Sequence, residues 1–225
     1  MSVSLSQYWA QLDALGYAVA YSLLLMSLLS WYLILSKAWV NFRVRKSARY
    51  LPAFWLAPDL TEASQELKQI DKESVFASLV EQAQGAHVHY QRGKNLSSHS
   101  AFNDVLTRVL RTEMNAVTVR LESGLTLLAS IGATAPFVGL LGTVWGIYHA
   151  LGSVSGNGAV QLDLIAGPVG EALVMTALGL IVAIPAVLAF NAFNRINRIT
   201  FAELDGFAYD LNAHFSATEL PSSRN

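Results

Sequence analysis

The sequence has no cysteine, and only 14% of its 225 residues are charged. Without cysteine the chain can form neither disulfides nor thiolate metal sites. Soluble domains carry about 25% charged residues, so the shortage of charge is the first indication of the class of protein. The formal net charge is −1, and this balance gives no support to a nucleic-acid partner.

Basic residues are also absent from two long stretches. None precedes Lys37, and none lies between Arg120 and Arg195, whereas 53% of the chain is apolar. A helix that crosses a bilayer needs about 20 mainly apolar residues. Three segments meet this need: residues 16–40, 122–151 and 167–193. The predicted fold class is therefore all-α, a polytopic membrane protein with three transmembrane helices and long cytoplasmic helical extensions.

The placement of basic residues predicts the orientation of these helices. Lysines and arginines cluster after the first segment, before the second and after the third. By the positive-inside rule these sides face the cytoplasm. We therefore expect residues 1–15 and 152–166 outside, and residues 41–121 and 194–225 inside. The first segment lacks the basic start of a cleavable signal peptide, so we expect it to remain as an anchor.

The cytoplasmic segments show helical patterns. Asp59 and Glu62 form a capping-box pattern, which predicts a helix over residues 60–84, followed by a polar loop at 91–100. From Phe102 a helical period continues into the second span with no breaker, which predicts one long helix. A similar pattern predicts that the third span continues to about Phe215, and that the last residues, 217–225, are disordered.

Motifs for chemistry are scarce. The sequence contains no nucleophile elbow, phosphate-binding loop or zinc signature. His87 and His89 would point about 200° apart on a helix, so a shared metal-ligand role is not expected. The sequence therefore favours a protein that is not an enzyme and that carries no cofactor and no metal.

Small residues line the second and third spans at helical spacing. The seam consists of Gly139, Gly142, Gly146, Ala172, Gly179 and Ala183, with Gly132 and Ala186 further along. Such residues let membrane helices approach closely. In one interpretation the seam only packs, and the hydroxyls of Thr143 and Thr176 bond to their own helix backbone. In the other, the two threonines are the polar groups of a narrow, mostly apolar passage.

Glu171 is the only carboxylate in the apolar cores of the last two spans, residues 124–151 and 167–193. A charge inside a membrane is costly and by default suggests a function. Alternatively, Glu171 lies near the outer boundary, in a first turn opened by Pro168, where an acid suits the helix dipole. Pro136 and Pro185 lie inside their spans and predict kinks. His149 is expected to be an interfacial residue and not a proton relay.

Two motifs carry a resemblance to a known family. They are IGATAPFVGLLGTVWGIYHAL at 131–151 and AGPVGEALVMTALGLIVAIPAVLAFN at 166–191. In this order and spacing they resemble the signature of the MotA/TolQ/ExbB proton-channel family. The GPVGEALVMTALGL form is most like ExbB, the chain length is closer to TolQ, and the MotA-type stator has four spans.

The resemblance implies a function and a set of partners. It implies a homopentamer in the inner membrane of a Gram-negative bacterium, with a periplasmic N-terminus and a cytoplasmic C-terminus. An ExbD-like single-span protein would lie inside the ring, a TonB-like protein would attach outside it, and the proton-motive force would drive TonB-dependent import, for example of iron. By motif position, Thr143 and Thr176 would face the partner's protonatable Asp, and Glu171 would be the functional carboxylate.

Three other functions stay open. A TolQ-type subunit of the Tol-Pal envelope system would bind TolR-like and TolA-like chains. A structural membrane scaffold with no transport would tolerate changes at Thr143, Thr176 and Glu171. A self-sufficient ion channel would conduct without a partner.

Overall fold

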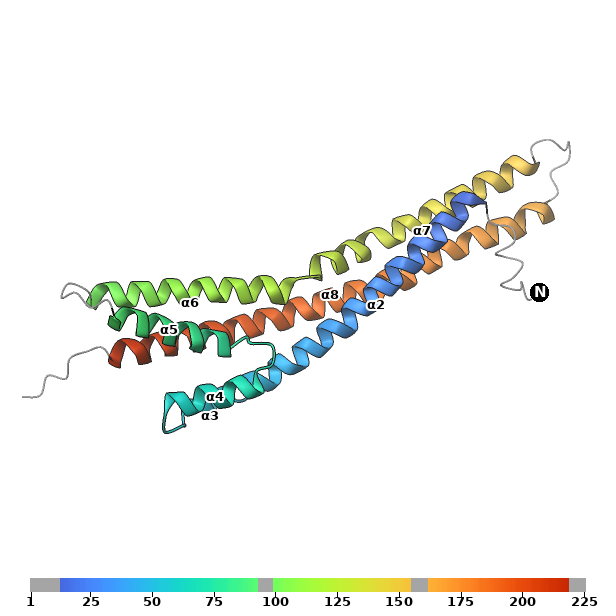
Figure 1. The fold of residues 1–225 in the computed structure, drawn as a ribbon. Helices are drawn as coiled ribbons and strands as arrows, with labels where there is room; N and C mark the ends of the chain where they lie inside the picture. The colour runs from blue at the N-terminus through green and yellow to red at the C-terminus, as the bar shows by residue number, and fades with distance from the viewer. Residues whose placement is uncertain (1–12, 93–98, 155–161, 219–225) are drawn as a thin grey trace, which may run out of the picture. The chain divides into compact units, whose positions relative to one another are not determined.

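The computed structural model describes residues 13–92, 99–154 and 162–218 and shows no strand among them (Figure 1). The helices are α2 (Ala14–Ala48), α3 (Leu51–Phe54), α4 (Leu60–Ile70), α5 (Ala77–Arg92), α6 (His99–Glu122), α7 (Leu125–Val154) and α8 (Leu162–Thr218). Within the described ranges, three helical segments are long and apolar enough to cross a membrane. The predicted all-α class and its three spans are confirmed.

The chain divides into two compact units. The first contains most of the membrane-spanning segments, and the second contains the helical extensions. Unit 1 comprises residues 1–36 and 124–192. In it the first part of α2, all of α7 and the first part of α8 lie side by side (Figure 1). Unit 2 comprises residues 37–123 and 193–225. It holds α3 to α6, with the last part of α2 and of α8.

Unit 2 has an apolar core of its own. Helix α8 contributes Leu204, Phe207 and Leu211 to it, against Leu79 of α5 and Leu106 of α6, all buried. The ring of Phe207 packs edge-on against other aromatic rings, Phe54 and Phe76 among them. Burial of such side chains stabilises the unit by about 1.5–3 kcal/mol each.

The helix predicted over residues 60–84 is wrong in one respect, because it is two helices. Helix α4 ends at Ile70 and α5 begins at Ala77, and the turn between them includes Ser74 with a φ of 51°. Asp59 precedes α4 with an extended backbone but makes no side-chain capping bond. Instead, Asp71 is buried and its Oδ2 accepts the backbone N–H groups of Phe76 and Ala77, at 2.7 and 2.9 Å. The capping carboxylate is therefore not the one predicted.

The single helix predicted from Phe102 into the second span is also interrupted. Helix α6 ends at Glu122 and α7 starts at Leu125, because Gly124 has a φ of 78°, a conformation that glycine adopts without strain. The open carbonyl of Leu121 accepts hydrogen bonds from Lys37 Nζ at 3.0 Å and from Asn197 Nδ2 at 3.2 Å. These two donors replace the backbone N–H that the Leu121 carbonyl would bond if the helix continued.

Helix α8 continues past the third span to Thr218, as the pattern through Phe215 predicted. Pro168 lies inside α8 and not at its start, because the helix already begins at Leu162. Most of residues 1–15, the centre of the 91–100 loop, the centre of the 152–166 loop and most of the tail lie outside the described residues.

Candidate functional site

The small residues predicted as a seam bring α7 and α8 close together in unit 1. A β-carbon on Gly139 would meet the carbonyl oxygen of Met175 at 2.6 Å and the Cα of Gly179 at 3.2 Å. Further along, a β-carbon on Gly146 would lie 2.9 Å from the Cβ of Ala172. Ala183 is buried in the same unit. Close backbone approach of this kind is how small residues associate membrane helices.

Thr143 and Thr176 meet within this packed region. Thr176 Oγ1 donates to Thr143 Oγ1 at 3.3 Å, and Thr143 Oγ1 donates to the carbonyl of Leu140 at 2.7 Å. Thr143 is only 3% exposed, whereas Thr176 is half-buried. The geometry thus combines both interpretations of the sequence, because one hydroxyl bonds its own backbone while the pair forms a short polar chain between two helices.

Glu171 is half-buried on α8, five residues before Thr176. Five helical residues turn the side chain by about 140° and shift it by about 7.5 Å along the axis. Glu171 therefore lies on a different face of α8 from the hydroxyl pair. Its neighbour Ala172 is in the contact with Gly146, so Glu171 flanks the α7–α8 seam.

The two prolines predicted to kink the spans lie inside unbroken helices, Pro136 in α7 and Pro185 in α8. Both are half-buried. Beside Pro136, Thr134 Oγ1 donates to the carbonyl of Ser130 at 2.8 Å, and Ser130 Oγ donates to the carbonyl of Thr126 at 2.9 Å. These three hydroxyl residues are exposed in the structure. Sequence analysis missed this stripe, although its spacing of four residues was visible.

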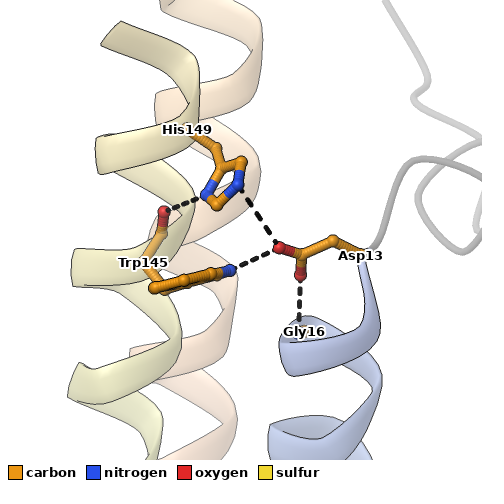
Figure 2. A network of polar contacts seen from close by, with 4 residues as sticks. All are labelled: Asp13, Gly16, Trp145 and His149. Atoms are coloured by element: carbon orange, nitrogen blue, oxygen red, sulfur yellow. Dashed lines mark hydrogen bonds and ion pairs between the residues drawn. The ribbon is translucent and has the colours of Figure 1, made fainter. Parts of the chain in front are cut away.

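Asp13 is at the centre of a polar network that the sequence did not reveal (Figure 2). Its Oδ1 accepts the backbone N–H of Gly16 at 2.8 Å, which caps the start of α2. Its Oδ2 accepts the indole N–H of Trp145 and lies 3.8 Å from His149 Nε2. Trp145 and His149 are one turn apart on α7, and their rings pack at a tilt of 48° with centroids 4.7 Å apart. One carboxylate thus joins two helices of unit 1.

The electrostatics of this network favour the charged form of Asp13. Chiefly the N–H of Gly16, then the indole of Trp145, lower the pKa of Asp13 below its ordinary value of 3.8. Partial burial opposes this effect, and His149 adds a smaller favourable interaction. Asp13 therefore remains a carboxylate, which can accept from several donors at once. No spacing rule relates Asp13 to Trp145, because 132 residues separate them.

The fold and the site define a class: a polytopic, all-α membrane protein whose spanning helices pack through small residues beside a pair of hydrogen-bonded hydroxyls. Comparison with known proteins agrees and gives the family. The profile of the MotA/TolQ/ExbB proton channel family matches residues 68–205. The chain belongs to this family.

Individual relatives lie in two branches of the family. Biopolymer transport protein ExbB of Xanthomonas campestris pv. campestris is 41% identical over 90% of this chain and 82% of its own length. Biopolymer transport protein ExbB of Neisseria meningitidis is 39% identical over 84% of this chain and 87% of its own. The Tol-Pal system protein TolQ of Haemophilus influenzae is 31% identical over 75% of this chain and 74% of its own. The chain is thus a multi-pass inner-membrane protein, a proton-motive-force-coupled subunit of the ExbB/TolQ type.

Proposed function

We propose that this chain is the stator and proton-channel subunit of an inner-membrane motor that, with an ExbD-like single-span protein, couples the proton-motive force to TonB-dependent outer-membrane import. The observation that carries the proposal is the Thr143–Thr176 hydroxyl pair, which joins α7 and α8 and in which Thr143 is buried and Thr176 half-buried. The similarity to proteins named ExbB supports the choice of branch.

The hydroxyl pair can relay or orient a proton but cannot store one. A hydroxyl donates one hydrogen bond and accepts others, whereas a proton carrier must change charge near neutral pH. Glu171, the one carboxylate within residues 124–151 and 167–193, lies on another face of α8. A second protonatable group must therefore come from elsewhere, and an inserted partner helix with an acidic residue would supply it.

The exposed apolar surface of unit 1 suits such an assembly. Large side chains of α7 are exposed in the isolated chain, with Phe137 at 70% and Val144 at 59%. On α2, Leu28 and Leu35 are similarly exposed. In a membrane, lipid covers part of this surface, and further copies of the chain with a central partner helix cover the rest. We propose a homopentameric ring.

The energy available fits a mechanical output. Each proton that crosses releases about 2.3 kcal/mol per 100 mV. Neutralising the partner's carboxylate inside the ring would change which subunit the partner helix prefers. The helix would then rotate or rock relative to the ring, and a TonB-like protein would carry the movement outward. In the proposed orientation, the start of α2 and the end of α7 face the periplasm and the C-terminus faces the cytoplasm.

The test removes each polar group while assembly is retained. Thr176→Val and Glu171→Ala should each reduce TonB-dependent uptake of an iron complex severalfold, with the oligomer unchanged on a native gel. Thr118→Val is the matched control, because the Thr118 hydroxyl also bonds its own helix, at 2.8 Å to the carbonyl of Met114, but lies in unit 2. Unaltered uptake in both site variants would favour a structural scaffold without transport.

A TolQ-type function is the second candidate, and the similarity to TolQ supports it. Co-purification separates the two, since an ExbB-type chain should retain an ExbD-like partner and a TolQ-type chain a TolR-like one. Deletion should impair iron-limited growth in the first case and detergent resistance in the second. Conductance of the purified chain without a partner would instead indicate a self-sufficient ion channel.

A further inference from the structure

We infer that Asp13 is a positioning residue of the motor, a clamp that holds α2 against α7 and that tightens when His149 is protonated. The inference rests on the proposed function for its role in proton-driven work. The clamp consists of Asp13, Trp145 and His149. Its existence can be tested separately from the proposed function.

The first step is the geometry of the carboxylate. Both oxygens of Asp13 are engaged: Oδ1 with the N–H of Gly16 in its own helix, and Oδ2 with the indole N–H of Trp145 in α7 (Figure 2). An N-cap needs only one oxygen. The second oxygen therefore gives the residue a further task, which is to connect the first turn of α2 to α7.

The second step is the position of the clamp on α7. Trp145 is two residues from Thr143, and the glycines on either side of them, Gly142 and Gly146, pack against α2 and α8. A β-carbon on Gly142 would lie 3.0 Å from Val19 of α2, and one on Gly146 would lie 2.9 Å from Ala172 of α8. Because the turn has little free space, a shift of α2 at Asp13 is transmitted to the α7–α8 seam that holds the hydroxyl pair.

The third step is the response to protons. His149 Nε2 lies 3.8 Å from Asp13 Oδ2, while Nδ1 lies 3.4 Å from the carbonyl of Trp145. Protonation would give the imidazole a positive charge, and the imidazolium would be attracted to the carboxylate. His149 is about half exposed in the isolated chain and lies near the outer end of the predicted second span.

Other titratable groups at this end must be considered as well. Tyr17 of α2 and Tyr148 of α7 carry phenol groups, and the ring of Tyr148 packs edge-on against that of His149 with centroids 5.6 Å apart. On α8 the acids at this end are Asp163, in the first turn, and Glu171, next to Ala172. The distance measurement described below, repeated at both pH values in a chain that carries Asp163→Asn and Glu171→Gln, therefore isolates the Asp13–His149 pair. In the proposed orientation this end faces the periplasm, the side from which protons enter.

The experiment measures the distance between α2 and α7 in the full chain. The native sequence has no cysteine, so Ala14→Cys and Leu151→Cys accept two spin labels at exposed sites. Dilution with unlabelled chain in reconstituted membranes keeps the labels within one protomer. The distance distribution should be narrow, and narrower at pH 5.5 than at pH 8. Asp13→Asn should broaden it at both pH values.

Two further variants separate the parts of the clamp. Trp145→Phe should broaden the distribution at pH 8, because the indole donor is lost. His149→Gln should match the native chain at pH 8 and should lack the narrowing at acid pH. Distributions in Asp13→Asn and Trp145→Phe that equal the native one would overturn the inference, and an acid response retained in His149→Gln would overturn its proton dependence.

Uptake assays then connect the clamp to the motor. Asp13→Asn should lower proton-driven uptake severalfold with the oligomer intact, whereas Asp205→Asn, at an exposed acid in unit 2, should not. His149→Gln should flatten the dependence of uptake on external pH. If the spin-label results hold but the native chain supports no TonB-dependent uptake, the proposed function fails and the clamp stands. If Thr176→Val abolishes uptake but Asp13→Asn changes neither uptake nor the spin-label distances, the proposed function stands and the clamp inference fails.

Discussion

Gly139 of α7 and Gly179 of α8 face each other so closely that a β-carbon on either would lie 3.2 Å from the Cα of the other. Each would also meet a backbone carbonyl oxygen, of Met175 at 2.6 Å and of Ala135 at 2.7 Å. A helix backbone cannot move aside as a flexible side chain can. The glycines therefore set the distance between the two helices.

The first prediction concerns this contact. Gly139→Ala and Gly179→Ala should each destabilise the protein by about 1–3 kcal/mol, the usual range for overpacking. Gly170→Ala is the control, since a β-carbon there meets nothing within 4 Å, and the added methyl should be neutral or favourable in a helix. The measurement is the fraction of intact oligomer left after heating in detergent. Equal thermal stability of all three variants would contradict the close approach.

The second prediction compares two aspartates that precede helices in unit 2. Asp71→Ala should destabilise by about 1–2 kcal/mol, because the buried carboxylate accepts the N–H groups of Phe76 and Ala77. Asp59→Ala should cost less than about 0.5 kcal/mol, because Asp59 is exposed and makes no capping bond. Thermal unfolding followed by circular dichroism would decide, and a larger effect at Asp59 would contradict the structure.

The same two aspartates show what a sequence can and cannot predict. A capping box is a pattern within four consecutive residues, so the sequence predicted Asp59 as the capping residue. The cap at Asp71 depends on how the turn through Ser74 folds back, and no fixed spacing describes such a turn. The break at Gly124 was missed for a similar reason, because an isolated glycine in a helical pattern does not by itself reveal a positive φ.

The membrane spans and their seam could be predicted because each depends on a repeated property. Bilayer thickness fixes the length of an apolar run, and helical spacing places small residues on one face. The contact between Thr143 and Thr176 follows once two such faces meet. Asp13 and Trp145 could not be paired in this way, because their contact depends on the offset of α2 along α7, which composition does not encode.

The third prediction uses the order of the hydroxyl chain. Thr176 donates to Thr143, and Thr143 donates to the carbonyl of Leu140. Thr176→Val leaves Thr143 with its own acceptor, whereas Thr143→Val removes the acceptor of Thr176. Thr143→Val should therefore be the more destabilising change, and a double-mutant cycle should give a coupling of about 0.5–1.5 kcal/mol. Additive effects in thermal unfolding would mean that the hydroxyls do not interact.

The fourth prediction concerns the end of α6. Lys37 Nζ donates to the carbonyls of Leu121 and Arg120 and to the hydroxyl of Ser123, at 3.0, 3.4 and 3.3 Å. Lys37→Met should fray the last turn of α6 and speed hydrogen exchange in a peptide that covers residues 116–124. Lys46→Met is the control, since Lys46 is an exposed lysine of the same helix. Unchanged exchange in Lys37→Met would show that Asn197 alone suffices at Leu121.

The last prediction is the pH dependence of the Asp13 network. The hydrogen bonds from Gly16 and Trp145 lower the pKa of Asp13 below 3.8. A carboxylate with a lowered pKa contributes stability that is fully present above its ordinary pKa and is lost as pH falls through the lowered value. In a His149→Gln background, which removes the imidazole charge, the stability advantage of Asp13 over Asp13→Asn should be constant from pH 7 to about pH 5. It should decline only below 3.8. Thermal unfolding of both chains across this range measures the difference, and an advantage that disappears by about pH 5 would mean that Asp13 is not held by these donors.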